Sequence, residues 1–483
     1  MRHLPSERGP ALLLIVLALL AAPPVRAADT DLSSIVDSFL ARPSFHGTRL
    51  GILVESQRTG EILYERNADS LFVPASNMKI VTGAAALSIL GPEFTFRTEF
   101  ATDGRRAGSI VDGDLVVRGV GDPSITAEEL WRLAQEVRAL GIDKITGDLV
   151  LDVSYLDSLP VTSPEVAEGD RAYQARTGAL SLNYSAVGVH VSPGPRAGDP
   201  AVVTLMPETG FVEARNRATT RPRRGAPEIE VRRVYEEGRN VLTVSGQIPV
   251  GWPEVVVNRN VDDPTAYFGA GLARFLSAAG IAVGGRVRVG VMPESAVVLG
   301  AHDSKPLSLI VRDLSKYSNN FIAEELLKVL DARMFGPPGT TAGGALALGD
   351  YLEALGADSL SYRIADGSGL SHENRLSPRT IVRVIRATLD DFDISHEFAA
   401  SLSVSGTDGT LEGRMRGGGL ERTIRAKTGL LDGVTAISGM MRTSAGEDVL
   451  FSIIVNCPAC SAVSSHGLEY AVLRLIQEGG LRE

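Results

Sequence analysis

The pattern of apolar and polar positions gives the two ends of the chain an α plus β character. Strands are predicted where apolar residues alternate between turn residues, and helices where they recur every three to four positions. The predicted strands form two hairpins, over residues 50–55 with 61–66 and over residues 434–442 with 449–456. The predicted helices cover residues 31–41, the run from Pro74 to Gly91, and residues 310–334, 341–355, 378–389 and 467–478.

The middle of the chain, from about residue 95 to 290, has a different pattern. Short alternating strands such as residues 145–152 and 241–245 are separated by clusters of Gly, Pro, Asp and Arg, and one helix is predicted over residues 266–279. We interpret this middle as an insertion in a discontinuous domain. The predicted parts are residues 28–95, one domain or two nested domains over 96–297, and residues 298–483.

The first residues are typical of a secretory signal peptide, predicted over residues 1–27. Arg2 and Arg8 precede an unbroken apolar run over residues 11–22, and Val25-Arg26-Ala27 offers small residues for cleavage. This run is too short to span a bilayer as a helix, and no later segment reaches spanning length. We therefore expect an exported protein, in the periplasm or cell-wall space, with no transmembrane segment after cleavage.

Composition excludes some classes of function and leaves others open. The 483 residues suggest two to four compact units, and 44% apolar with 22% charged residues is typical of a folded protein. A net charge of −10 argues against nucleic-acid binding. A run of arginines over residues 214–234 leaves peripheral association with a membrane or anionic wall polymer open, although solvated loops commonly carry such runs.

Lysine is rare enough for each one to be considered separately. Only six of the 48 basic residues are lysine, namely Lys79, Lys144, Lys305, Lys316, Lys328 and Lys427. Chemistry that releases a proton can use lysine but not arginine. Lys79 stands in Ser76-Asn77-Met78-Lys79, an SxxK motif at the start of a predicted helix. Positions i and i+3 share a helix face, so a neutral Lys79 could serve as the base for Ser76.

A second motif is the SxN sequence Ser318-Asn319-Asn320, which opens a predicted helical segment. The Ser318 hydroxyl could pass a proton to a leaving amine, and Asn320 could hold a substrate amide. The third motif is Lys427-Thr428-Gly429, on a strand-like run. Its lysine and threonine suit a carboxylate, and its glycine allows a substrate backbone to approach.

Each motif alone is weak, and Ser76 by itself would be read as a helix N-cap. Their order and context together point to a serine acyl-transferase. No histidine stands in an HExxH motif or beside a GxSxG motif, and Gly119-Val120-Gly121 lacks the last glycine of a dinucleotide fingerprint. We therefore expect no metal and no cofactor.

Cys457 and Cys460 could form a local disulfide in an exported protein, or be an incidental pair.

In these motifs the chain resembles the D-alanyl-D-alanine carboxypeptidase and endopeptidase family, the low-molecular-mass class C penicillin-binding proteins. The resemblance covers nearly the whole mature sequence. It extends to four further signatures in the family's order, at residues 119–124, 180–184, 366–371 and 409–411. The resemblance implies an α+β fold with a transpeptidase/β-lactamase-like core, an antiparallel sheet flanked by helices, and a large strand-rich insertion after the SxxK helix.

The resemblance also implies roles for the motif residues. Ser76 would attack the D-Ala-D-Ala carbonyl of peptidoglycan stem peptides, Lys79 would take its proton, and Ser318 would protonate the departing D-alanine. The remaining implied site residues are Asn320 for the substrate amide, Lys427 and Thr428 for the carboxylate, Gly429 for backbone approach, and Leu430 with Ser76 for backbone donors to the oxyanion. β-Lactam antibiotics would acylate Ser76 and inhibit the enzyme.

Some positions depart from the family's pattern. Leu430 stands where a small hydroxyl residue is common, Asp432 follows it, and His372 stands where arginine is frequent. These departures leave the stem-peptide preference open, together with the balance between carboxypeptidase and endopeptidase activity.

Two alternative functions are considered. A class A β-lactamase would need a glutamate where Ala179 stands, and a catalytically silent wall-binding protein predicts a decayed motif, which is not seen.

Overall fold

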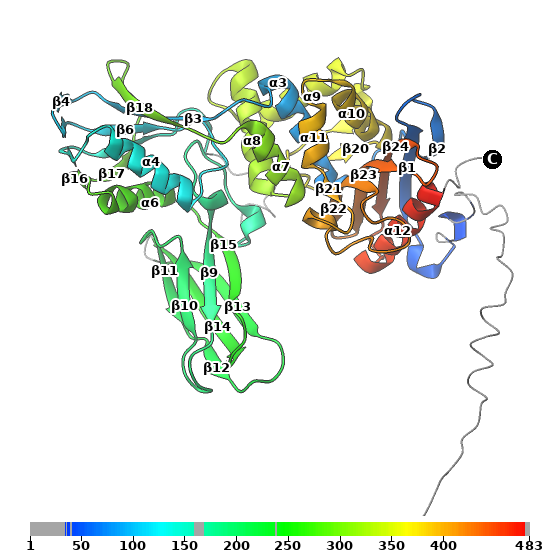
Figure 1. Cartoon of the computed structure of the whole chain (residues 1–483), viewed down its shortest axis with the longest axis horizontal. Helices are drawn as coiled ribbons and strands as arrows, with labels where there is room; N and C mark the ends of the chain where they lie inside the picture. Colours follow the sequence, from blue (N-terminus) through cyan, green and yellow to red (C-terminus); the bar gives the residue numbers. More distant parts are fainter. Residues whose placement is uncertain (1–33, 35, 39–40, 159–168, 237–238, 479–483) are drawn as a thin grey trace, which may run out of the picture.

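The computed structural model describes residues 34, 36–38, 41–158, 169–236 and 239–478. The predicted signal peptide and most of the helix predicted over residues 31–41 lie outside these residues. Figure 1 shows three parts: a core of helices around a sheet, a smaller block of strands and helices beside it, and a strand-rich arm that projects away from both.

The core is built around a six-stranded sheet in the order β2-β1-β24-β23-β22-β21. All of its pairings are antiparallel, and two of them, β1 with β2 and β23 with β24, are the two predicted hairpins. The sheet places the first strand of the chain beside the last one. Its strands are β1 (Arg49–Ser56), β2 (Ile62–Arg66), β21 (Ser403–Val404), β22 (Ile424–Leu431), β23 (Val434–Arg442) and β24 (Asp448–Asn456).

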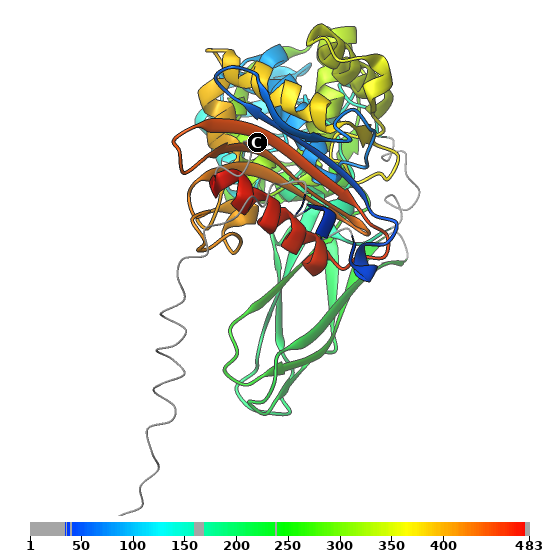
Figure 2. The same cartoon turned by 90° about the vertical axis from the view of Figure 1, so that its right-hand side faces the viewer.

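Helices cover both faces of this sheet, because its strands are apolar on both sides. Along β24, Leu450 and Ile454 pack into one hydrophobic cluster, while the alternate residues Phe451 and Ile453 pack into another. The terminal helix α12 (Ala462–Glu478) covers the second face, and Figure 2 shows it lying across the strands. The first face carries α3 (Met78–Leu90), α7 (Leu307–Lys316), α8 (Asn320–Phe335), α9 (Thr341–Ala354), α10 (Pro378–Asp390) and α11 (Ser395–Ser401).

The single helix predicted over residues 310–334 is wrong, because the chain breaks between α7 and α8. Ser318 has a φ of 54°, a left-handed conformation that no α-helix can contain. Asn319 then starts a new helix by accepting a hydrogen bond from the backbone N–H of Ile322. The apolar pattern continues across the break because both helices are buried in the same cluster.

The part of the block that the structure describes contains two helices, whereas the sequence pattern predicted one. Helix α6 (Pro264–Ala278) agrees with the predicted one, and α4 (Ala127–Ala139) was missed. Leu130 and Val137 of α4 are buried, and Thr126 caps its start. The helices pack on sheets formed by β3 (Arg97–Thr102), β4 (Arg105–Ala107), β5 (Ile110–Asp112), β6 (Leu115–Arg118), β7 (Lys144–Ile145), β8 (Leu149–Asp152), β16 (Ala282–Val283), β17 (Val287–Val289) and β18 (Val297–Asp303).

The chain leaves the core at β3 and returns to it at β18, and these two strands pair with each other. Since β18 belongs to the sheet of the block, we propose that the insertion ends after Asp303 and not at residue 297.

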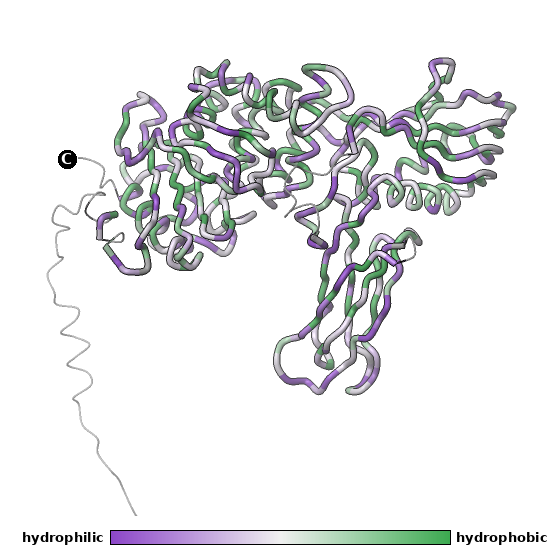
Figure 3. Tube along the Cα trace, turned by 180° about the vertical axis from the view of Figure 1, so that it is seen from behind, coloured by the Kyte–Doolittle hydropathy of each residue, from purple (hydrophilic) through white to green (hydrophobic). Residues whose placement is uncertain are grey.

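The arm is a pair of small sheets with polar and apolar residues intermixed along its strands, as Figure 3 shows. Arginines of its basic run form ion pairs with acidic residues, such as Arg215 with Glu236 and Arg232 with Glu230. This run is therefore no uniform basic patch. The strands of the arm are β9 (Ala186–Ser192), β10 (Val202–Met206), β11 (Val212–Asn216), β12 (Thr219–Arg221), β13 (Glu228–Glu236), β14 (Arg239–Pro249) and β15 (Val255–Asn260).

Cys457 and Cys460 form a disulfide directly after β24. The closed loop is short, so its contribution to the free energy of unfolding is small, about 2 kcal/mol by loop-closure entropy. We expect a reducing agent to lower the free energy of unfolding by that amount, measured as a lower urea midpoint with an unchanged slope of the transition. A midpoint that is equal with and without reductant would show that the bond does not contribute to stability.

Candidate active site

Ser76 lies in a single 3-10 turn, η2 (Ala75–Asn77), that leads directly into α3. The turn starts at Ala75, which has a φ of 47° and is fully buried. A left-handed conformation at a non-glycine residue costs energy and is held in place by its surroundings. Lys79 follows one turn later, and its Nζ lies 3.0 Å from Ser76 Oγ, to which it donates a hydrogen bond.

Lys79 is held by two further acceptors. Its Nζ donates to Asn320 Oδ1 at 2.7 Å and to the carbonyl oxygen of Ser368 at 2.6 Å. Burial lowers the pKa of Lys79 to about 8, against the opposing charges of Asp366 and Glu324, which raise it. A lysine with this pKa is partly neutral near neutral pH, as a general base must be.

Lys427 lies on β22 and supplies a second cation. Its Nζ donates to Ser318 Oγ at 2.7 Å. Burial and the charge of Lys79 lower the pKa of Lys427 well below its usual value. Thr428 Oγ1 donates to the hydroxyl of Thr410 at 2.8 Å. The left-handed backbone at Ser318 therefore turns its hydroxyl toward β22.

Gly429 brings β22 against the turn that carries Ser76. A Cβ at position 429 would lie 3.0 Å from the Pro74 carbonyl oxygen and 3.1 Å from the backbone nitrogen of Ser76. Only a residue without a side chain allows this approach. The backbone N–H groups of Ser76 and Leu430 thus belong to two segments that touch each other. Leu430 itself is 57% exposed and directs its side chain away from the core.

The loop over residues 366–371 positions Lys79 through the carbonyl oxygen of Ser368, to which Lys79 Nζ donates. Asp366 is fully buried and accepts hydrogen bonds from the backbone N–H groups of Gly369 and Ser371 at 2.7 and 2.6 Å. Glu324 accepts from the backbone N–H of Ser368 at 2.9 Å. Burial raises the pKa of Glu324 to about 7, and the charge of Asp366 adds to that rise. Both carboxyl groups thereby fix the carbonyl that Lys79 contacts.

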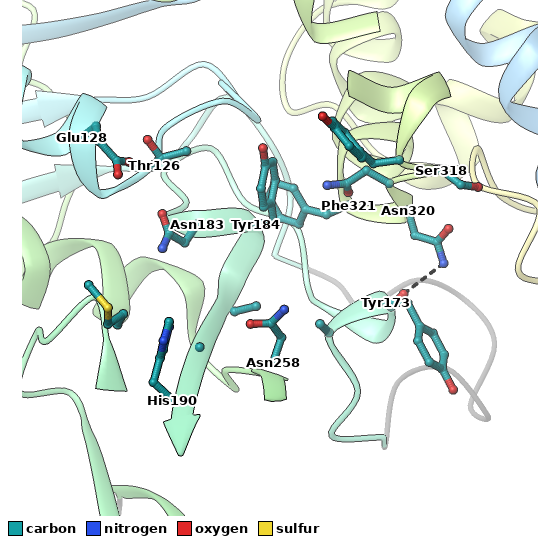
Figure 4. A pocket seen from close by; sticks show the side chains of 16 residues that line it. Thr126, Glu128, Tyr173, Asn183, Tyr184, His190, Asn258, Ser318, Asn320 and Phe321 are labelled. Carbon is teal, nitrogen blue, oxygen red and sulfur yellow. Dashed lines mark hydrogen bonds between the residues drawn. The ribbon is translucent and has the colours of Figure 1, made fainter. Parts of the chain in front are cut away.

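All eight predicted site residues meet at one place, at the junction of α3, α8 and β22. Three contributors were missed in the sequence. Tyr173 comes from the insertion and accepts a hydrogen bond from Asn320 Nδ2 through its backbone carbonyl at 3.2 Å, which Figure 4 shows. Glu324 lies one turn after Asn320 on α8, and its spacing was the only available signal. Asp366 belonged to a noted signature, but no role was assigned to it.

A cavity of about 670 Å³ leads to Ser76. Asn320, Tyr173, His372 and Asp432 are among the residues that line it. This volume falls in the range of small-molecule sites. The positions that departed from the family's pattern therefore line the same cavity as Ser76.

The fold and site define the class: a penicillin-binding type of serine hydrolase with a transpeptidase/β-lactamase-like core. The chain belongs to the D-Ala-D-Ala carboxypeptidase 3 (S13) family, whose sequence model matches residues 32–473.

Curated relatives and solved structures agree with this membership. The chain is 36% identical over 465 residues to a D-alanyl-D-alanine carboxypeptidase of Actinomadura sp. (strain R39), covering 92% of this chain and 85% of the relative. It is 27% identical over 416 residues to D-alanyl-D-alanine carboxypeptidase DacB of Haemophilus influenzae, covering 85% and 86%. The crystal structure of penicillin binding protein 4 (dacB) from that organism superposes with a TM-score of 0.75 at 26% identity, over 89% of this chain and 97% of that one.

In the part of the chain that the structure describes, no helix combines the length and the apolar character needed to cross a membrane.

Proposed function

We propose that this chain is an exported serine-type D-Ala-D-Ala carboxypeptidase, a DD-endopeptidase or both, and that it acts on peptidoglycan stem peptides in the periplasm or cell-wall space. The observation that carries the proposal is the contact of Ser76 Oγ with a buried Lys79 whose pKa is lowered to about 8. Family membership supports the substrate class and acylation by β-lactams. A β-lactam complex of the Haemophilus influenzae protein supports the latter as well.

Acylation begins when neutral Lys79 takes the hydroxyl proton of Ser76. The oxygen then forms a bond to the carbonyl carbon of the penultimate D-alanine, and the N–H groups of Ser76 and Leu430 stabilise the oxyanion. The C–N bond breaks as Ser318 passes to the amine of the leaving residue the proton that Lys79 took from Ser76, so that Ser318 and Lys79 end the step in the protonation states in which they began it. Lys427 supports that transfer because its Nζ contacts Ser318 Oγ at 2.7 Å. It also binds the terminal carboxylate with Thr428.

Hydrolysis completes the cycle. Neutral Lys79 takes a proton from a water molecule as the water oxygen attacks the acyl carbon, and the bond to Ser76 breaks as Lys79 returns that proton to the serine oxygen. We assign Asn320 to the substrate amide, since its side chain already lies between Lys79 and Tyr173.

A β-lactamase is not favoured, because position 179, where the class A pattern would require glutamate, holds a buried alanine.

The cavity that leads to Ser76 suits a stem-peptide side chain that carries both an amine and a carboxylate. His372 and Asp432 line the same cavity as Ser76 and are both exposed. We propose that Asp432 receives an amine of the stem peptide and that His372 receives a carboxylate, in place of an arginine.

The rate of acylation should rise with pH up to about 8. Lys79 acts as a base only when neutral, so below its pKa of about 8 the neutral fraction falls about tenfold for each pH unit. Stopped-flow labelling with a fluorescent penicillin between pH 5 and 9 measures this profile. A flat profile across that range would contradict Lys79 as the base.

The activity itself is tested by mass spectrometry of purified muropeptides. A pentapeptide monomer and a cross-linked dimer are each incubated with wild type and with Ser76→Ala. Loss of one D-alanine from the monomer establishes the carboxypeptidase, and cleavage of the dimer establishes the endopeptidase. If the wild type changes neither substrate, the proposed function is wrong.

A further inference from the structure

A second cavity, of about 610 Å³, lies on the insertion side of the Ser318-Asn319-Asn320 turn (Figure 4). Its walls come from the start of α4, the start of β9, β15 and the first turn of α8. None of the proposed chemical steps uses this space beyond its edge at Ser318 and Asn320. Its position nevertheless places any occupant beside the reacting groups.

The backbone at one wall is strained. Asn183, Tyr184 and Ser185 have φ values of 49°, 58° and 52°, so three successive non-glycine residues are left-handed. This conformation is unfavourable for residues other than glycine, and strain of this kind persists where the surroundings require it. The turn packs the Tyr184 ring edge-on against Phe321, with centroids 6.2 Å apart. The residues 180–184, a signature without an assigned role, thus shape the cavity and brace the helix that carries Asn320.

The lining is aromatic and amide-rich but carries little charge. Tyr184 and the 74% exposed Tyr317 offer ring surface, and Asn258 is an exposed amide at the wall. Of the lining residues in the described part of the chain, none is Lys or Arg, and apart from tyrosines only Glu128 and His190 can ionise. A peptide with several carboxylates would need cations here. A neutral ligand with apolar ring faces, hydroxyls and amides fits better.

Two features connect this cavity to the one that leads to Ser76. Tyr173 and Asn320 line both cavities, so they form the boundary between the two spaces. Gly188 keeps the second cavity open, because a Cβ there would lie 3.2 Å from His190 Nε2 and 3.4 Å from Asn258 Oδ1. One extended polymer could therefore occupy both spaces at once.

We propose that this second cavity binds a neutral N-acetylated saccharide, the glycan part of the polymer whose peptide reacts at Ser76. This inference rests on the proposed function for its biological substrate. The aromatic rings would face the apolar side of a pyranose, while Asn258 would bind hydroxyl or acetamido groups.

The test uses the full chain and tri-N-acetylchitotriose as the probe. Calorimetric titration should show binding to wild type, weakened about tenfold in Asn258→Ala by loss of hydrogen bonding and in Gly188→Val by filling of the cavity. Tyr235→Ala, an exposed tyrosine of the arm outside the lining, is the matched control and should bind as wild type does. A paired kinetic assay compares kcat/KM for one pentapeptide with and without its attached disaccharide.

We expect the disaccharide to raise kcat/KM in wild type and to lose that advantage in both cavity variants. Equal binding of the probe by all four proteins, or no binding by wild type, would overturn the inference. So would a preference for a sugar-free cross-linked peptide that the cavity variants abolish. Because the titration needs no reaction at Ser76, it still decides on the cavity if neither peptide is cleaved, a result that overturns the proposed function alone.

Discussion

Lys79→Arg should acylate with penicillin about 10² to 10⁴ times more slowly than wild type, the usual contribution of a general base. Arginine keeps the positive charge but cannot give up its proton near neutral pH. In wild type, the Nζ atom of Lys79 lies 3.0 Å from Ser76 Oγ and is fully buried. The variant therefore separates a proton transfer from a purely electrostatic role. Stopped-flow labelling at saturating and limiting penicillin gives the second-order rate.

Two further variants allow this result to be interpreted. Lys79→Met removes the charge as well and should be impaired to the same extent, since both variants lack the base. Lys144→Arg, at an exposed position of β7, is the matched control and should label at the wild-type rate. Unfolding curves of all three establish that the fold is kept. Labelling of folded Lys79→Arg at the wild-type rate would contradict the assignment of the base.

Asp366→Asn should lower the free energy of unfolding by about 1–3 kcal/mol, because a buried hydrogen-bonding arrangement is broken. Asp366 Oδ1 accepts from Gly369 N and Asn374 Nδ2, and Oδ2 accepts from Ser371 N at 2.6 Å. An amide group presents only one acceptor oxygen, so its NH₂ would face a backbone N–H. Urea denaturation measures the loss.

The same substitution should shift the pH profile of acylation. The charge of Asp366 raises the pKa of Lys79, so its removal lowers that pKa further and moves the acid limb toward lower pH. A merely structural role would reduce the rate without moving the limb. Asp393→Asn, at an exposed site, is the control and should leave both stability and profile unchanged. A limb that stays in place or moves upward would rule out the electrostatic coupling.

The residues that we propose to react were accessible to sequence reasoning because each motif is local. SxxK spans one helical turn, and a strand-forming run follows Lys427-Thr428-Gly429. The two terminal hairpins were equally accessible, since period-two alternation along β24 survives burial of both faces. The family resemblance supplied the core fold, which the solved relatives confirm.

The supporting residues were not accessible, for physical reasons. Tyr173 contacts Asn320 through a backbone carbonyl, and every residue type offers one. Glu324 and Asp366 act by accepting backbone N–H groups, so their role depends on where a distant loop folds. The SxN motif placed a helix start near Ser318, but the apolar pattern did not show the break, because it runs through two helices that share one hydrophobic cluster. Tertiary contacts decide each of these features.

The pairing of β1 with β24 has a consequence for the order in which the molecule assembles. The nucleophile is made early in synthesis, but the central sheet cannot close until its last strand has emerged. The block and the arm lie wholly between these segments and have their own hydrophobic cluster, so they can fold first. A partly synthesised chain therefore carries Ser76 without the assembled site. Hydrolysis must await synthesis of the final hairpin.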